Sequence, residues 1–111
     1  MRNTDPKIGL LRTVPGFAAL SDRALARLAS YFDEAHVGAG SVLAREGGLG
    51  HELLLIVEGQ ASVTRAGTSD GELGPGELVG ETAVLGPLPH SSHIVARTPM
   101  RVLVAGPESL R

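Results

Sequence analysis

The sequence of 111 residues contains no cysteine and no tryptophan. Without cysteine there can be no disulfide bond, no thiolate metal ligand and no cysteine nucleophile. No stretch approaches the roughly 18 consecutive apolar residues that span a bilayer, and residues 1–13 are too polar for a signal peptide. We therefore expect a cytoplasmic protein with no membrane contact.

The sequence also has no large excess of positive or negative charge. Ten Lys and Arg residues stand against twelve Asp and Glu residues, and the basic residues form no run. This balance argues against direct binding of nucleic acid by the domain. The 42% share of apolar residues is typical of a folded domain, and because only three residues are aromatic, its core must be mostly aliphatic.

The N-terminal part predicts two helices. Thr4 or Asp5 can cap a short helical turn that has Pro6 at its first position. Ser21 is a good N-cap for a second helix over residues 21–32. One face of this helix is predicted to be apolar, through Leu25, Leu28, Ala29 and Phe32.

From residue 33 onward, glycines divide the chain into pieces that are too short for helices. The best predicted strands cover residues 41–45, 53–57, 61–65, 93–96 and 101–105. Turns at 38–40, 58–59 and 65–67 are expected to make neighbouring strands antiparallel. Many short strands with regular turns predict a barrel, a sandwich or a jelly-roll.

We expect one domain over residues 1–111, with helices at 1–32 and strands at 33–105. Residues 106–111 begin like a helix, because Pro107 and Glu108 suit a first turn. Either this end is frayed or a longer protein was cut here.

Several motifs follow one another in a recognisable order. They are Val-Pro-Gly-Phe-Ala-Ala-Leu-Ser at 14–21, Gly-Ala-Gly at 38–40, Arg-Glu-Gly at 45–47, Val-Glu-Gly at 57–59, Leu-Gly-Pro-Gly at 73–76, Gly-Glu-Thr-Ala-Val-Leu at 80–85 and Pro-His-Ser-Ser at 89–92. In this order the sequence resembles the cyclic-nucleotide-binding domain family over nearly its whole length. The resemblance implies a mainly β fold, an antiparallel β-roll or double-stranded β-helix (jelly-roll) with flanking helices, whose last C-terminal helix is truncated here.

The segment at 80–85 suits an anion on physical grounds. Gly80 lets the backbone approach a ligand, and the N–H groups of Thr82, Ala83 and Val84 can face a phosphate at a helix start. Glu81 can simply satisfy the helix dipole. The family resemblance implies instead that its carboxylate accepts hydrogen bonds from a ribose 2′-hydroxyl.

The residues at 90–92 complete this predicted phosphate-binding segment. Ser91 and Ser92 offer hydroxyl and backbone donors. The family pattern has an arginine where this chain has His90, which lacks a permanent charge and a planar fork. Since a hydrogen bond to a charged group contributes about 1.5–3 kcal/mol, this change lowers the expected affinity by about one to two powers of ten.

The resemblance therefore implies a regulatory module rather than an enzyme. It would bind cAMP, cGMP or a related phosphate ligand weakly, need no cofactor, and signal to an attached or partner output domain. The alternative is a degenerate β-roll that binds no ligand and acts as a structural or protein-interaction domain.

Other patterns give weaker hypotheses. His90 and His93, with His51 and Glu52, could be metal ligands in a small jelly-roll, but residues three apart on a strand face opposite sides. No Gly-x-Ser-x-Gly elbow supports a hydrolase. Arg97 or Arg101 could replace the missing phosphate contact, although both are expected to flank a turn.

Overall fold

The computed structural model describes residues 5–14, 16–48, 52–80 and 90–106. Within them lie two helices and eight strands. Their bounds are α1 Pro6–Arg12, α2 Asp22–Ala29, β1 Asp33–Val37, β2 Val42–Ala44, β3 Leu53–Glu58, β4 Ala61–Arg65, β5 Thr68–Leu73, β6 Leu78–Val79, β7 His93–Ala96 and β8 Met100–Ala105. No helix in these ranges is long and apolar enough to cross a membrane.

Both helices begin at the predicted caps. The Asp5 side chain accepts a hydrogen bond from the Lys7 N–H at 2.9 Å, and the Ser21 hydroxyl accepts one from the Ala24 N–H at 3.1 Å. α2 ends at Ala29, a turn earlier than the prediction of 21–32. Ser30 is the C-cap, and its hydroxyl donates to the Arg27 carbonyl, a local bond that competes with further helix.

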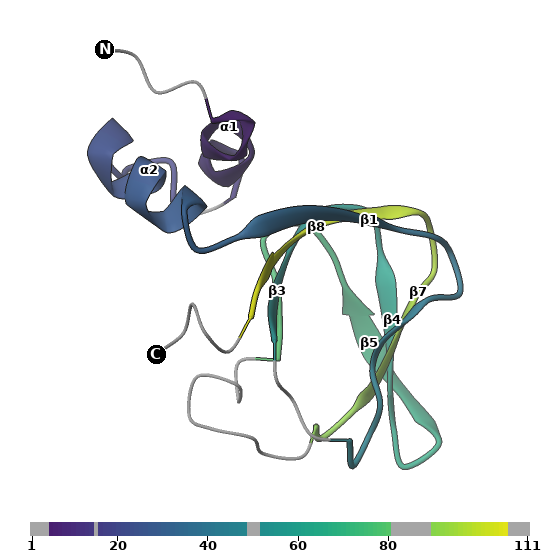
Figure 1. Ribbon diagram of the computed structural model, residues 1–111. Helices are drawn as coiled ribbons and strands as arrows, with labels where there is room; N and C mark the ends of the chain where they lie inside the picture. Colours follow the sequence, from purple (N-terminus) through teal and green to yellow (C-terminus); the bar gives the residue numbers. More distant parts are fainter. Residues whose placement is uncertain (1–4, 15, 49–51, 81–89, 107–111) are drawn as a thin grey trace.

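The strands form two antiparallel sheets of four, in the orders β1-β8-β3-β6 and β2-β7-β4-β5. The mainly β, antiparallel β-roll with flanking helices is thus confirmed (Figure 1). The expectation that each predicted turn joins antiparallel neighbours is wrong at 38–40 and 58–59. At both places the chain crosses from one sheet to the other, and only the turn at 65–67 closes a hairpin, between β4 and β5.

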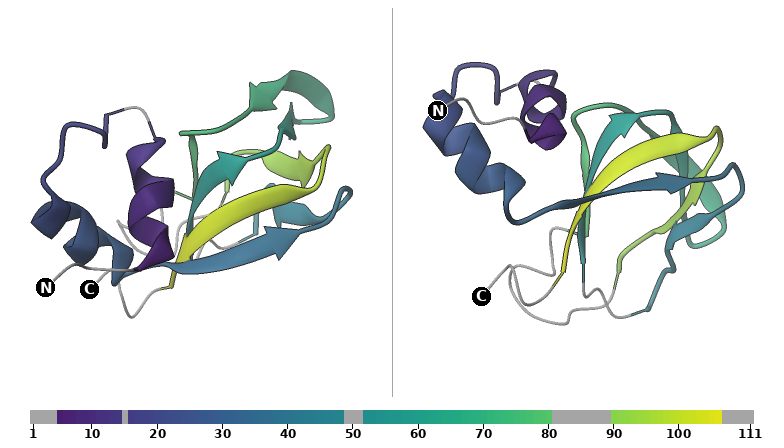
Figure 2. Two further views of the ribbon diagram at one scale, coloured as in Figure 1. Left: turned by 90° about the horizontal axis from the view of Figure 1, so that it is seen from above. Right: turned by 45° about the horizontal axis from the view of Figure 1, so that its top comes forward.

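Two apolar clusters account for the apolar sequence of β3 and β8. Leu55 and Val57 of β3 belong to the cluster that also contains Leu25 and Ala29 of α2. Ile56, between them in sequence, belongs to the second cluster, which fills the space between the two sheets. Because β3 is buried on both faces, its apolar residues do not alternate with polar ones. Both helices accordingly lie on one side of the β-roll (Figure 2).

The strands β1, β5 and β6 were not predicted. All residues of β5 except the last are exposed, so the sequence of this strand does not alternate between apolar and polar residues. β6 has only two residues, which is too short for a recognisable pattern. The pairing of β4 with β5 shifts between Ser62 and Thr64, so two β5 residues, Asp70 and Gly71, stand opposite one residue of β4. This bulge interrupts the regular alternation of β5 side chains between the two faces of the sheet.

Candidate functional site

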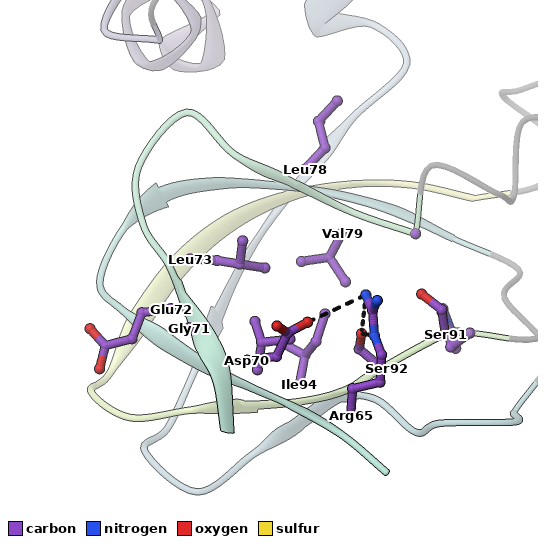
Figure 3. Close-up of a pocket in the computed structure, with 13 residues that line it drawn as sticks. Arg65, Asp70, Gly71, Glu72, Leu73, Leu78, Val79, Ser91, Ser92 and Ile94 are labelled. Carbon is purple, nitrogen blue, oxygen red and sulfur yellow. Dashed lines mark hydrogen bonds and ion pairs between the residues drawn. The ribbon is translucent and has the colours of Figure 1, made fainter. Parts of the chain in front are cut away.

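A pocket of about 350 Å³ is lined by residues of both sheets, from β4, β5 and β7 of one and β6 of the other. We call it the inner pocket. Figure 3 shows Leu73, Val79 and Ile94 around its apolar side, and Arg65, Asp70 and Ser92 together on its polar side. A pocket of this size with an apolar wall and a few convergent polar groups is the usual form of a small-molecule site.

The predicted site residues within the described ranges all line this pocket: Gly80, His90, Ser91 and Ser92. They come from two distant segments, the end of β6 and the approach to β7. The remaining predicted residues, Glu81, Thr82, Ala83 and Val84, lie outside the described residues. The roles of all eight stay predictions.

Gly80 is required by the protein backbone itself. Its φ is +86°, a region that side chains rarely adopt, and a Cβ at this position would collide with the carbonyl oxygen of Glu52. From the sequence we predicted that a glycine at this position lets the backbone approach a ligand. The structure shows a second reason for a glycine here, which is close packing against the residue before β3.

The backbone of His90 is fixed by the loop between β2 and β3. Its N–H donates to the Gly48 carbonyl at 2.8 Å, and its carbonyl accepts from the Gly47 N–H at 2.9 Å. The Arg-Glu-Gly motif at 45–47 therefore holds the predicted phosphate-binding histidine in place at the pocket. This contact joins two motifs that are far apart in the sequence.

Arg65 is the pocket residue that sequence reasoning missed. Its Nε and Nη2 atoms lie 3.3 and 3.2 Å from the Ser92 hydroxyl oxygen and donate to it. Nη2 also lies 3.5 Å from a carboxylate oxygen of Asp70. The sequence did contain a signal, because Arg65 continues the alternate positions of Ala61 and Val63 along the strand. The structure buries Ala61 and Val63, so Arg65 lies on the same face of β4.

The other two arginines considered for a phosphate contact are occupied by carboxylates. Arg97 forms an ion pair with Glu72. Arg101 donates to Glu34 at 2.6 Å and to Glu58 at 3.3 Å. The Arg101 hydrogen bond is the main reason why the pKa of Glu34 is lowered.

The two histidines of the His-x-x-His pattern line different hollows. His90 lines the inner pocket, whereas His93 lines a hollow with Arg45, Glu46 and Thr64. His51 lies outside the described residues. In the parts of the chain that are described, no group of three or more His, Asp or Glu side chains is placed to hold a metal ion.

Comparison with known proteins gives a consistent result. A family model described as the cyclic nucleotide-binding domain matches residues 34–111. The chain is 30% identical over 105 residues to a cAMP-dependent protein kinase regulatory subunit of Yarrowia lipolytica, a match that covers 93% of this chain and 28% of that protein. It is 34% identical over 96 residues to a cyclic nucleotide-gated potassium channel of Rhizobium etli, covering 85% of this chain and 26% of the channel.

A solved structure is similar along most of its own length. The N-terminal domain of a transcriptional regulator from Streptomyces coelicolor is 32% identical to this chain, with a TM-score of 0.76. The match covers 91% of this chain and 76% of that one. By contrast, the chain spans only about a quarter of the length of the curated relatives.

Proposed function

The chain belongs to the cyclic nucleotide-binding domain family, and we propose that its inner pocket binds a cyclic nucleotide, cAMP or cGMP, or a related phosphate ligand. The module is regulatory rather than catalytic, works in the cytoplasm, and passes the binding event to an attached or partner output domain. Neither nucleic acid nor a membrane is among the partners proposed for this domain.

The observation that carries the proposal is the form of the inner pocket. Its volume of about 350 Å³ lies within the range of small-molecule sites. Val79 and Ile94 supply an apolar surface on which a base or sugar can lie, and the predicted phosphate-binding residues His90, Ser91 and Ser92 stand at the polar side. A nucleotide has the same division into an apolar part and a charged part.

Each predicted residue has a role in this proposal. The N–H groups of Thr82, Ala83 and Val84 hold phosphate oxygens next to Gly80. Glu81 accepts hydrogen bonds from the ribose 2′-hydroxyl. Ser91 and Ser92 donate hydroxyl hydrogen bonds, and the His90 ring adds a further one.

Signalling follows from a shift in population. A ligand that binds one arrangement of the predicted phosphate-binding segment more tightly than another shifts the equilibrium toward it. The kinase regulatory subunit and the channel to which this chain is similar are several times longer than the matched region. A further segment of a longer protein, or a separate partner, would detect the shift.

Titration calorimetry with cAMP and with cGMP at pH 6 and pH 7.5 tests the proposal. We expect micromolar to millimolar dissociation constants. Absence of heat at millimolar ligand at both pH values would leave the alternative, a β-roll that binds no ligand and serves as a structural or protein-interaction domain.

The role of Glu81 has its own test. Glu81→Ala should weaken binding of cAMP about tenfold, the usual cost of losing a hydrogen bond to a charged group. It should leave binding of 2′-deoxy-cAMP nearly unchanged, because that ligand lacks the hydroxyl. Equal losses for both ligands would show that Glu81 acts on the fold and not on the ribose.

A further inference from the structure

The inner pocket already contains a guanidinium, although the family's arginine is absent from position 90. Among the described residues that line it, Arg65 is the one arginine. Arg97 and Arg101 do not line the pocket: Arg97 is paired with Glu72 at its edge, and Arg101 with Glu34 and Glu58 outside it. A fixed positive charge therefore reaches the pocket from β4 and not from the predicted phosphate-binding segment.

The position of Arg65 is set by strand register. β4 and β7 pair regularly from Ala61 opposite Ala96 to Thr64 opposite His93. One further step places Arg65 opposite Ser92, on the face where Val63 and Ile94 are buried. The side chain thus projects toward the pocket because of where its strand ends.

A hydrogen bond from the adjacent turn holds the end of β4 in place. Ala66 has a φ of +52° and Gly67 one of +79°, as in a tight hairpin turn. The Ala66 N–H donates to the Glu46 carboxylate, with distances of 3.0 and 3.3 Å to its two oxygens. The loop that fixes His90 therefore also fixes the backbone next to Arg65.

The Nε–Nη2 edge of the Arg65 guanidinium is suited to binding a phosphate. Its Nε and Nη2 atoms both point at one oxygen, the Ser92 hydroxyl. The same edge can hold two oxygens of a phosphate in parallel hydrogen bonds. Ser92 is only 7% exposed, and within the described residues its hydroxyl accepts from Arg65 and donates to no protein atom, so it is able to donate to a ligand oxygen.

Asp70 neutralises Arg65 only weakly. The two charged groups are 3.5 Å apart, and both side chains are about half exposed. An ion pair exposed to water in this way contributes little to stability. A phosphate can therefore replace the Asp70 carboxylate at the guanidinium without a large loss.

We propose that Arg65 and the Ser92 hydroxyl together bind the phosphate of the ligand, and that Arg65 supplies the fixed charge and planar fork that His90 lacks. The inference rests on the proposed function, since the phosphate is taken to be that of a cyclic nucleotide. Asp70 pairs with Arg65 and competes with the ligand for its guanidinium.

Arg65→Gln tests the proposal, with Arg97→Gln as a matched control. Both changes remove an arginine of nearly equal exposure that is paired with a carboxylate of β5. Arg65→Gln should weaken cAMP binding about 10- to 100-fold, and Arg97→Gln should leave it nearly unchanged.

Two further variants refine the test. The affinity of Arg65→Lys for cAMP should lie between those of wild type and Arg65→Gln, because lysine keeps the positive charge but lacks the planar guanidinium. Asp70→Asn should tighten binding about two- to fivefold.

A second measurement separates this inference from the proposed function. In NMR spectra, inorganic phosphate should shift the Nε–H signal of Arg65 and leave that of Arg97 in place. If phosphate does this while neither cyclic nucleotide binds, the anion site stands and the nucleotide function fails. If cAMP binds and Arg65→Gln behaves like Arg97→Gln, the function stands and the role of Arg65 is overturned. If neither phosphate nor nucleotide has any effect, both proposals fail.

Discussion

Arg65 and Ser92 are cross-strand neighbours one step beyond the last paired residues of β4 and β7, and two guanidinium nitrogens of Arg65 donate to the Ser92 hydroxyl at 3.2 and 3.3 Å. The two residues lie 27 positions apart in sequence. Their contact joins the arginine to the segment that resembles the family's phosphate-binding region. The phosphate contact that we infer for the pocket depends on this pair, whereas the proposed function can stand without it.

Ser92→Ala should weaken cAMP binding about two- to tenfold, because it removes one hydrogen bond to the ligand and leaves Arg65 less well positioned. Titration calorimetry on the variant measures the change. Ser91→Ala is the neighbouring comparison: it removes only the ligand hydrogen bond proposed for Ser91 itself, and Ser91 is exposed and makes no contact with Arg65 in the described residues, so a smaller loss is expected. A larger loss for Ser91→Ala than for Ser92→Ala would contradict the pairing of Arg65 with Ser92 as the anion site.

His90→Arg should tighten cAMP binding about 10- to 100-fold, because it restores a permanent charge and a planar fork. The same change should rescue much of the affinity that Arg65→Gln loses, since either guanidinium can hold the phosphate. Calorimetry on the two single variants and the double variant gives the coupling between the sites. Unchanged affinity in His90→Arg would place the phosphate away from residue 90.

Gly80→Ala should destabilise the fold by about 3 kcal/mol, since φ is +86° and the new Cβ would collide with the Glu52 carbonyl. Gly67→Ala is the control, with a φ of +79° and no atom within 4 Å of the added Cβ. This change should lower the free energy of unfolding by only about 1 kcal/mol, which is the effect of the unfavourable backbone conformation alone. Urea unfolding of both variants measures the difference. Equal losses would show that the approach of Glu52 to Gly80 has no energetic effect.

Glu34 should make stability depend on pH. The hydrogen bond from Arg101, helped by its charge, lowers the pKa of Glu34 below its ordinary value of 4.5. The pair therefore stabilises the folded state above about pH 4.5, and this stabilisation is lost as the pH falls through the lowered pKa. Urea unfolding at pH 7, 5 and 3 measures the free energy of unfolding. Wild type should be more stable than Glu34→Gln at pH 7, and the stabilities of the two proteins should converge at pH 3.

Asp33→Asn controls for the removal of a negative charge from the same strand, since within the described residues Asp33 has no ion-pair partner. A gap between wild type and Glu34→Gln that stays constant down to pH 3 would show that protonation of Glu34 does not govern stability. The measurement needs no ligand, so its outcome is independent of the proposed function.

Much of the fold could be predicted from local sequence. The caps Asp5 and Ser21 were predicted because capping involves residues only two or three positions apart. The strands predicted at 53–57 and 61–65, from an apolar run and an alternating sequence, correspond to β3 Leu53–Glu58 and β4 Ala61–Arg65. β5 was missed because its polar sequence has no periodicity that distinguishes it from a loop.

The predicted connections failed for a different reason. Gly59 stands where the chain leaves one sheet for the other, packed so closely against Pro99 and Met100 that a Cβ would not fit. A glycine in a turn is equally consistent with a hairpin and with such a crossing. The choice depends on which strand offers the better partner across the β-roll, and that partner is distant in sequence.

The sequence by itself determined the two helices, the β-rich class and the segment at 80–92 where an anion is expected, because each depends on residues close together along the chain. Tertiary structure alone decided that Arg65, and neither Arg97 nor Arg101, reaches the pocket. That outcome depends on the register of β4 against β7, which places Arg65 opposite Ser92; Asp70, at the bulge of β5, pairs with the Arg65 guanidinium. Register and bulges are fixed by packing across strands, so no local pattern contains them.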